Sequence, residues 1–498
     1  MRGRVLCSAQ PMLSRHAAHA PCPPARAAAS RAVLLLALVL ALPAAARAQE
    51  DPIDITGQQN LTLGSGARAY GMGGAFLARA DDATAASWNP AGLSYLRAPE
   101  LSLVGAHNSY DTVRNLNSDS FHGSTVDFAA FTWPVGAGEV RGAVQLSYQR
   151  AISYDGTRHI DEYGVVGSQS TLVRTDDAKS DGGFDVVAFG TGLRLSRRIR
   201  AGFTVNRWFN GYEQATERNN FLPSTDRQRR DFALDLRPSG WSFNLGVIYS
   251  PVEALNLAAV FKTPFTAATS ADRSRHDYYG PADKPEEITT NSYSSDGVRI
   301  EFPYSLGFGL SWRAMDRLTL SADYTRSAWS RARILNFFEL RATPPTDAHG
   351  NPGVPPPPQF TDQQQYPTLV PVPDPSDPTD PSRLTAQQDA EQIRAGAEWV
   401  LFAGRFKIPL RGGYFNDRQI TPSPGGQPVR FNGLTAGTGV ILGALQLDLA
   451  WVYEFGEYFV AAESGSTVAG SPAQIRYALT TNRVFASIIY RFSGRWLP

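Results

Sequence analysis

The chain has 498 residues, of which 42% are hydrophobic, 19% are charged and 11% are aromatic, and its formal net charge is +1. This apolar content excludes an intrinsically disordered protein. The two cysteines are too few for a small scaffold held together by disulfides.

Residues 1–48 have the features of a secretory signal peptide. The apolar run at 32–42 follows Arg31 and precedes the small-residue sequence Ala46-Arg47-Ala48. We therefore predict cleavage after Ala48. The leader carries both cysteines and several arginines but no acid, so the exported chain has no thiol and is acidic overall. These properties exclude cysteine metal sites and argue against a nucleic-acid partner.

Residues 49–99 precede the first predicted strand and contain a segment rich in Gly and Ala. From 64 to 96 the sequence lacks a two-residue hydrophobic period, and it holds Asp81-Asp82 and the turn-forming sequence Asn89-Pro90-Ala91-Gly92. Small residues let a backbone approach its surroundings closely. We predict that this segment is a compact hatch inside a barrel.

The chain after residue 99 alternates apolar and polar residues with the period of a β-strand, and it lacks the roughly 20 consecutive apolar residues of a transmembrane helix. In 445–455, Leu447, Leu449 and Trp451 share one face and Asp448 lies on the other. We predict an all-β fold, a 14-stranded antiparallel transmembrane β-barrel over residues 100–492. Its strands are predicted at 100–107, 124–134, 140–151, 184–196, 199–212, 240–249, 255–265, 300–312, 318–329, 392–402, 407–415, 432–441, 445–455 and 483–492.

Short and long connections alternate strictly between these strands. An outer-membrane barrel requires this order, with tight periplasmic turns and larger outer loops, whereas a soluble β-sandwich does not. The longest connection, 330–391, is rich in proline and favours extended polyproline geometry, so we predict a long extracellular loop. The long connections are 108–123, 152–183, 213–239, 266–299, 330–391, 416–431 and 456–482.

Aromatic residues gather in or at the ends of the predicted strands. Rings of this kind are typical of the interfacial girdle of a membrane barrel. We predict that girdle from Trp133, Trp208, Trp241, Trp312, Trp329, Trp399 and Trp451, with Tyr212, Tyr249, Phe265, Tyr414, Phe455 and Phe492.

The hatch segment resembles the amino-terminal hatch of the FadL/TodX family of outer-membrane transporters for long-chain fatty acids and other hydrophobic compounds. The resemblance rests on Gly66, Ala69-Tyr70, Ala80-Asp81-Asp82 and Asn89-Pro90-Ala91, and it continues through strand motifs at 240–247, 302–307 and 409–414. Asn89, Pro90 and Ala91 carry over as the hatch motif, with either a gating role or a local turn-forming role.

The resemblance implies a monomeric barrel in the outer membrane, surrounded by outer-membrane lipid and lipopolysaccharide. It also implies that a hydrophobic ligand is captured from outside and released sideways through a gap in the wall. Such passage is passive and needs no cofactor, metal or catalytic residue. The sequence does not place the gap.

Charged residues on the lumen-facing phase of the strands are candidate contacts for a ligand headgroup. Arg394 and Arg411 could bind a carboxylate in two-point geometry, and Glu398 lies on the same face. Alternatively, these charges pair with one another. If both arginines are neutralised by acids, uncharged hydrocarbons become better candidate substrates than fatty acids.

Two other functions stay open. Residues 71–76 also resemble PorV-like accessory barrels of secretion systems, which act through protein partners. Some outer-membrane barrels modify lipids with Ser and His, but the exported histidines show no nucleophile elbow or metal-binding pair. These histidines, at the edges of or within predicted outer loops, are His107, His122, His159, His276 and His349.

Overall fold

The computed structural model describes residues 64–114, 117–137, 140–166, 169–221, 226–281, 286–335, 366–367, 372–373, 384–385, 388–420, 427–461 and 474–492. The predicted signal peptide, residues 49–63 of the predicted hatch and most of the predicted loop at 330–391 lie outside the described residues. No helix in the described ranges is long and apolar enough to cross a membrane.

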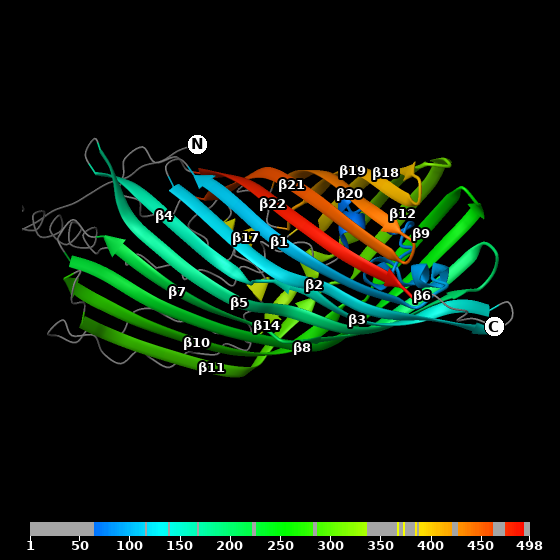
Figure 1. The fold of residues 1–498 in the computed structure, drawn as a ribbon. Helices are drawn as coiled ribbons and strands as arrows, with labels where there is room; N and C mark the ends of the chain where they lie inside the picture. The colour runs from blue at the N-terminus through cyan, green and yellow to red at the C-terminus, as the bar shows by residue number, and fades with distance from the viewer. Residues whose placement is uncertain are drawn as a thin grey trace, which may run out of the picture. The chain divides into compact units, whose positions relative to one another are not determined.

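Fourteen antiparallel strands pair edge to edge in a closed ring (Figure 1). The last strand, β22 (Gln474–Arg491), pairs with the first, β1 (Glu100–Arg114), which closes the ring. The predicted fold class and number of strands are confirmed. Between these two lie β2 (Asn117–Ala137), β3 (Val140–Ser153), β5 (Gln169–Arg194), β6 (Ile199–Phe209), β8 (Asp226–Val252), β9 (Leu255–Lys262), β12 (Ser305–Met315), β13 (Leu318–Ser327), β18 (Ala390–Ala403), β19 (Phe406–Arg418), β20 (Arg430–Leu442) and β21 (Leu445–Ala461).

Further strands extend one side of the ring into a tall wall. Here β4 (Gly156–Val166) pairs with β2 and β5, and β7 (Tyr212–Phe221) pairs with β5 and β8. The hairpin of β10 (Phe265–Pro281) and β11 (Glu286–Phe302) pairs with β8. The short strands β14 (Arg333–Leu335), β15 (Tyr366–Pro367), β16 (Val372–Pro373) and β17 (Leu384–Thr385) fall within the predicted 330–391 loop.

The tall wall corrects the sequence analysis, which treated 152–183, 213–239 and 266–299 as polar loops. These segments are rich in charged residues, and apolar residues alternate in them only over short stretches such as 232–236. Arg218 of β7, for example, donates two hydrogen bonds of 2.9 and 2.8 Å to the carboxylate of Asp176 on β5. Cross-strand ion pairs of this kind stabilise a sheet where the apolar alternation is short, so a search for hydrophobic period overlooks it.

Two predicted strands, 255–265 and 300–312, divide at Pro264 and Pro303. Proline has no amide hydrogen with which to continue a ladder of hydrogen bonds. On one side of the two prolines, β9 and β12 pair within the ring. On the other side, β10 and β11 pair within the tall wall.

The outer face of the ring is apolar. In β21, Leu447, Leu449 and Trp451 are 42%, 51% and 46% exposed, whereas Asp448 is 4% exposed. A membrane barrel has this arrangement, with side chains facing lipid outside and polar or packed side chains inside. The strand phase predicted for this segment is confirmed.

The hatch lies inside the ring, at the end where the strands are joined by short turns (Figure 1). It contains α2 (Ala67–Gly71), α3 (Ala85–Trp88) and the 3-10 helix η2 (Pro90–Tyr95). Tyr70 stacks on Phe485 of β22 with ring centroids 4.0 Å apart, and Trp88 packs edge-on against Tyr70 and Phe76. The predicted position of the hatch in the lumen is confirmed for the described residues.

Candidate functional site

The predicted hatch motif, Asn89-Pro90-Ala91, begins η2. Asn89 is fully buried and caps the helix, and its Oδ1 accepts a hydrogen bond of 3.1 Å from the Ala91 amide. Its Nδ2 donates to the Leu77 carbonyl at 2.9 Å and to the Val247 carbonyl of β8 at 3.4 Å. One side chain therefore forms the turn and ties the hatch to the wall.

The hatch motif packs against three glycine residues of the barrel wall. Gly192 of β5, Gly202 of β6 and Gly246 of β8 face the lumen, and a Cβ atom at any of them would overlap Pro90 or Asn89. Sequence reasoning recognised the hatch motif but missed its three partners in the wall. The available signal was a glycine inside a strand, which often marks the close approach of another backbone.

A buried ion network joins the hatch to the wall. Glu398 of β18 lies at its centre, with its carboxylate oxygens 2.8 Å from Arg411 Nε, 3.1 Å from Arg68 Nε and 3.0 Å from Arg79 Nη2. The structure thus brings two predicted site residues, Glu398 and Arg411, into contact with each other. The members of this hatch–wall ion network are Arg68, Arg79 and Asp81 of the hatch and Glu398, Arg411 and Asp448 of the wall.

Each charge in the network has an opposite charge beside it. Arg411 Nη1 lies 2.7 Å from Asp448 Oδ1, and Arg68 Nη1 lies 2.6 Å from Asp81 Oδ1. Burial alone would raise the pKa of Asp81, but Arg68 and Arg79 hold it below its usual value of 3.8. The carboxylate therefore stays ionised while the hatch is seated.

The third predicted residue, Arg394 of β18, contacts the hatch elsewhere. Its Nη1 donates to the Gly73 carbonyl at 2.9 Å, its Nη2 lies 2.7 Å from Asp417, and its guanidinium lies over the ring of Phe415. Both predicted headgroup arginines are thus beside acids, and neither is exposed. The geometry supports the alternative in which these charges pair with one another, and the headgroup role stays a hypothesis.

Asp323 of β13 is another residue of the wall that contacts the hatch. Its Oδ2 accepts hydrogen bonds from the backbone amides of Phe76 at 2.6 Å and Leu77 at 2.8 Å. A carboxylate bound by two backbone amides fixes a chain segment firmly. Asp323 therefore holds the bend of the hatch that follows α2.

An aromatic cluster stands in the lumen beside the hatch and corrects part of the predicted girdle. Trp208 stacks on Phe265 and on Phe302 with centroids 4.8 and 5.7 Å apart, and Trp329 packs edge-on against Phe302. Trp208 and Trp329 are 9% and 3% exposed. Trp208 faces inward because strand phase, rather than position near a strand end, decides the side on which a ring lies. Trp329 lies beyond β13, in the 3-10 helix η3 (Trp329–Arg331).

The other residues of the predicted girdle also include both inward-facing and outward-facing rings. Tyr212 is buried inside, where it stacks on Tyr154. The rings that do lie on the exposed outer face include Trp133, Trp241, Trp312, Trp399, Trp451, Tyr249, Tyr414 and Phe455.

The aromatic cluster borders a cavity of about 80 Å³. Ala86 and Ser87 of the hatch form one side of it, and Lys262 of β9 lies at its edge, where Nζ is 3.5 Å from the Ser87 carbonyl. Trp208 Nε1 donates to Ser242 Oγ at 2.8 Å. The site therefore offers flat apolar surfaces with a few polar atoms, as small-molecule sites do.

Apolar side chains continue from this cavity into the part of the lumen enclosed by the tall wall. We call them the apolar lumen cluster. Its large members are Ile152, Phe184, Leu234, Leu236, Val298 and Ile300, and it includes Trp208, Phe302 and Trp329 of the aromatic cluster. The sequence analysis did not identify it, because most of its strands lie in segments taken for loops.

Residues 123–127 of β2 pair with neither β3 nor β4, although 123–126 still pair with β1. Phe128–Ala137 pair with β3 and Ser118–His122 pair with β4, and the register with β1 shifts at the same level. Asp127, in the bulge, accepts a hydrogen bond from Ser65 Oγ at the start of the described hatch. The wall is therefore irregular where the hatch reaches it.

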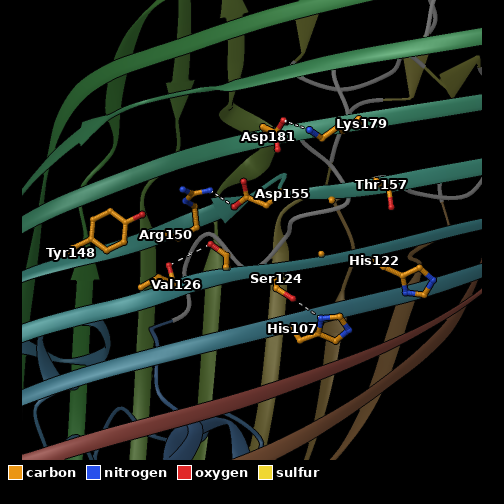
Figure 2. A pocket seen from close by; sticks show the side chains of 13 residues that line it. His107, His122, Ser124, Val126, Tyr148, Arg150, Asp155, Thr157, Lys179 and Asp181 are labelled. Carbon is orange, nitrogen blue, oxygen red and sulfur yellow. Dashed lines mark hydrogen bonds and ion pairs between the residues drawn. The ribbon is translucent and has the colours of Figure 1, made fainter.

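A depression of about 730 Å³ lies over this interruption. Figure 2 shows Tyr148, Arg150 and Asp155 on one side of it and Ser124 and Val126 on the other. Arg150 is paired with Asp155 and with Asp185. Most of the residues that line the depression are polar or charged.

The four described histidines that were predicted in or at the edges of outer loops lie on strands. His107 Nδ1 and Ser124 Oγ share a hydrogen bond of 2.8 Å, and His159 Nδ1 lies 2.6 Å from Asp177 Oδ1. In the described ranges, no group of three or more His, Asp or Glu side chains is placed to hold a metal ion. His349 lies outside the described residues.

A sequence model of the family described as BamG matches residues 32–343. The chain belongs to the BamG family. No curated protein sequence matches it. Among solved structures, this BamG-family chain is similar to the CymD monoaromatic hydrocarbon channel, with 14% identity, 88% of this chain and 99% of that chain covered, and a TM-score of 0.51.

Two further solved structures share the fold. A Pseudomonas aeruginosa FadL homologue has 12% identity, covers 86% of this chain and 99% of its own, and gives a TM-score of 0.53. The Pseudomonas putida toluene transporter TodX has 14% identity, covers 86% of this chain and 98% of its own, and gives a TM-score of 0.51. At these identities the resemblance to FadL/TodX proteins holds for the fold, which is that of membrane β-barrels typical of outer membranes.

Proposed function

We propose that this BamG-family protein is an outer-membrane barrel through which hydrophobic small molecules pass without an energy source. The carrying observation is the aromatic cluster and cavity beside the hatch, continuous with the apolar lumen cluster. In this proposal the protein is a monomer surrounded by outer-membrane lipid and lipopolysaccharide, and it uses no cofactor and binds no nucleic acid.

The energetic basis is the transfer of apolar surface out of water. Burial stabilises a ligand by about 0.8 kcal/mol for each methylene group, before ordering costs are subtracted. Flat rings of Trp208 and Phe302 suit a planar ligand, because offset stacking adds about 0.5–1.5 kcal/mol beyond the buried area. A solute that an aqueous pore would not retain is thus concentrated beside the hatch.

The pairing of Arg394 and Arg411 with acids favours an uncharged ligand. Arg394 and Arg411 are held by Asp417, Glu398 and Asp448, so removing either from its acid to bind a headgroup would leave a buried charge uncompensated. We assign these arginines to fastening the hatch. The solved structures named as a monoaromatic hydrocarbon channel and a toluene transporter fit the same ligand class.

The ligand's exit is proposed at the interruption between β2 and β3. Residues 123–127 pair with neither β3 nor β4, so the wall is held there only by the pairing of 123–126 with β1, and Ser65 of the hatch is bonded to Asp127 at this point. Movement of this end of the hatch would join the lumen to the interruption. The depression in Figure 2 lies along that route.

Binding of toluene to the purified full-length protein in detergent tests the proposal. Trp208→Ala removes a ring from the cavity, and Trp241→Ala removes a lipid-facing ring that is 56% exposed. We expect Trp208→Ala to weaken toluene binding by about tenfold, which equals about 1.4 kcal/mol, and Trp241→Ala to have no effect. Equal binding by both variants and the parent would refute the proposal.

A PorV-like accessory barrel is the competing function. Such a protein would act through a partner and would not need a cavity with aromatic walls. Absence of any toluene or alkane binding, together with stable co-purification of a defined protein, would favour it.

A further inference from the structure

Three arginines lie side by side on neighbouring strands at the end of the barrel that holds the hatch. In the register of the sheet, Arg141 of β3 stands opposite Arg194 of β5, and Arg194 stands opposite Arg200 of β6. Directly opposed residues in a sheet have Cβ atoms about 4.5–5.5 Å apart, and like charges in that position are destabilising. An unfavourable arrangement of this kind indicates a function other than folding.

All three arginines are on the lumen-facing phase of their strands. Gly192 and Gly202, each two residues away from one of them, contact Pro90 of the hatch. The guanidinium of Arg200 lies 4.1 Å from the ring centroid of Tyr95 at the end of η2. The arginines therefore lie beside the hatch at the end of the barrel where short turns join the strands.

A fourth cation comes from the hatch. Arg97 is two residues beyond Tyr95, the last residue of η2, on whose ring the guanidinium of Arg200 lies. We call Arg97, Arg141, Arg194 and Arg200 the arginine stripe. None of the four forms an ion pair within the part of the chain that the structure describes.

Polar atoms beside the stripe also lack partners. The Tyr95 hydroxyl and Arg200 Nε are buried without a hydrogen bond among the described residues. The bonds that the stripe does make are weak contacts of 3.3 Å, from Arg194 Nε to the Ser196 carbonyl and from Arg200 Nη1 to Ser250 Oγ. Buried polar groups are normally satisfied, so these atoms suggest a missing partner.

The same end of the barrel is basic on its far side. Arg313, Arg317 and Lys407 occupy lumen-phase positions at the ends of β12, β13 and β19, and all three are exposed. Arg317 and Lys407 both lie over the ring of Phe402. Exposed cations thus lie on both sides of the mouth of the barrel at this end, although the exposed acids Glu253 and Asp316 stand in the turns there.

We propose that the arginine stripe is the docking site for an acidic segment of a protein on the hatch side of the membrane. Guanidinium groups match carboxylates in two-point geometry, and four guanidiniums without ion pairs among the described residues, three of them side by side on β3, β5 and β6, fit a chain with several carboxylates. Such a segment would contact Arg97 and the end of η2, and its binding would therefore affect how firmly the hatch is held in the barrel.

The strand phase favours a protein over a lipid. The lipid-facing phase at this level carries Leu195 and Ile199, which are 63% and 41% exposed. The stripe lies on the opposite phase, inside the mouth. A membrane phospholipid would have to leave the bilayer surface to bring its phosphate there.

The test uses the full-length protein in nonionic detergent and a fluorescent all-glutamate peptide, with an all-glutamine peptide of equal length as the uncharged probe. The test variant combines Arg97→Gln, Arg141→Gln and Arg194→Gln, and it keeps Arg200 because that side chain packs on Tyr95. The matched control combines Arg229→Gln, Arg237→Gln and Arg326→Gln, whose arginines are paired with acids toward the other end of the barrel.

We expect salt-sensitive binding of the all-glutamate peptide that is about tenfold weaker in the test variant and unchanged in the control. Equal protease resistance of the hatch in both variants confirms that folding is intact. Binding that the test variant retains, or that both variants lose equally, overturns the proposal. A stripe that instead retains phosphatidylglycerol in nanodiscs, with no peptide binding, also overturns it and identifies a lipid site.

Discussion

Glu398 and Arg68, which are 330 positions apart in the chain, meet in the lumen with an oxygen–nitrogen distance of 3.1 Å. This contact joins the wall of the barrel to its hatch. Because Glu398 also contacts Arg79 and Arg411, one carboxylate compensates three cations in a place with little water. The seating of the hatch therefore depends strongly on this residue.

Glu398→Gln should loosen the hatch. The change leaves the buried Arg411 and the partly exposed Arg68 and Arg79 short of a negative charge, and breaking a buried ion pair from one side costs up to about 3–5 kcal/mol. Hydrogen exchange of residues 64–99 measures the effect. Glu457→Gln is the control, because its pair with Arg476 is exposed and should contribute about 0–1 kcal/mol. Similar exchange in both variants would show that the network does not hold the hatch.

Gly202→Ala should displace η2. The new Cβ would overlap the backbone of Pro90, and neither backbone can move without disturbing β6 or the hatch. Gly412→Ala is the matched control, since the nearest heavy atom to its Cβ lies at 3.8 Å. We expect lower thermal stability and higher ion conductance in planar bilayers for the first variant alone. If Gly412→Ala gives the same increase, the glycine seat is not the cause.

Asn89→Asp should separate the two functions of the hatch motif. The carboxylate can still accept from the Ala91 amide, but it cannot donate to the Leu77 carbonyl, which then faces a negative charge. Loss of a buried hydrogen bond with an unsatisfied partner costs about 1–3 kcal/mol. Proteolysis of the hatch should be faster than in the parent and in Asn416→Asp, a change at a partly exposed amide. A hatch as resistant as that of the parent would leave Asn89 without a structural role.

The seating of the hatch should depend on pH through Asp81. Because the pKa of Asp81 is lowered in the folded protein, its carboxylate stabilises the hatch above the unfolded value of 3.8, and this contribution is lost as pH falls through the lower folded value. The stability difference between the parent and Asp81→Asn should be full between about pH 5 and 7 and should shrink below 3.8. Hydrogen exchange of 64–99 across this range measures it, and a difference that does not vary with pH would contradict the assignment.

The sequence was sufficient for the barrel because membrane strands repeat one simple rule, an apolar side chain toward lipid at every second position. The same rule placed Arg394, Glu398 and Arg411 in the lumen. The girdle prediction failed for Trp329, which lies in η3 and not on a strand. It failed for Trp208 because an aromatic ring near a strand end satisfies the composition of a girdle whichever way it points. Only the phase of neighbouring residues distinguishes the two sides.

The tall wall escaped prediction for a different reason. The strands of the tall wall are rich in charged residues, and pairs such as Arg218–Asp176 take the place of a regular apolar alternation. The seat of the hatch was equally hidden, because a glycine in a strand does not reveal which distant backbone it meets. Likewise, the arginine stripe depends on register across β3, β5 and β6, which no single segment contains.

The glycine seat has a consequence for how the protein acquires its final form. The hatch is made before the barrel, yet it rests on β5, β6 and β8 through η2 and on the final strand through Tyr70 and Phe485. It therefore cannot settle until nearly all of the cylinder has been assembled around it. During biogenesis the barrel should pass through an unplugged stage, in which the newly closed pore conducts ions until its own amino-terminal segment enters and shuts it.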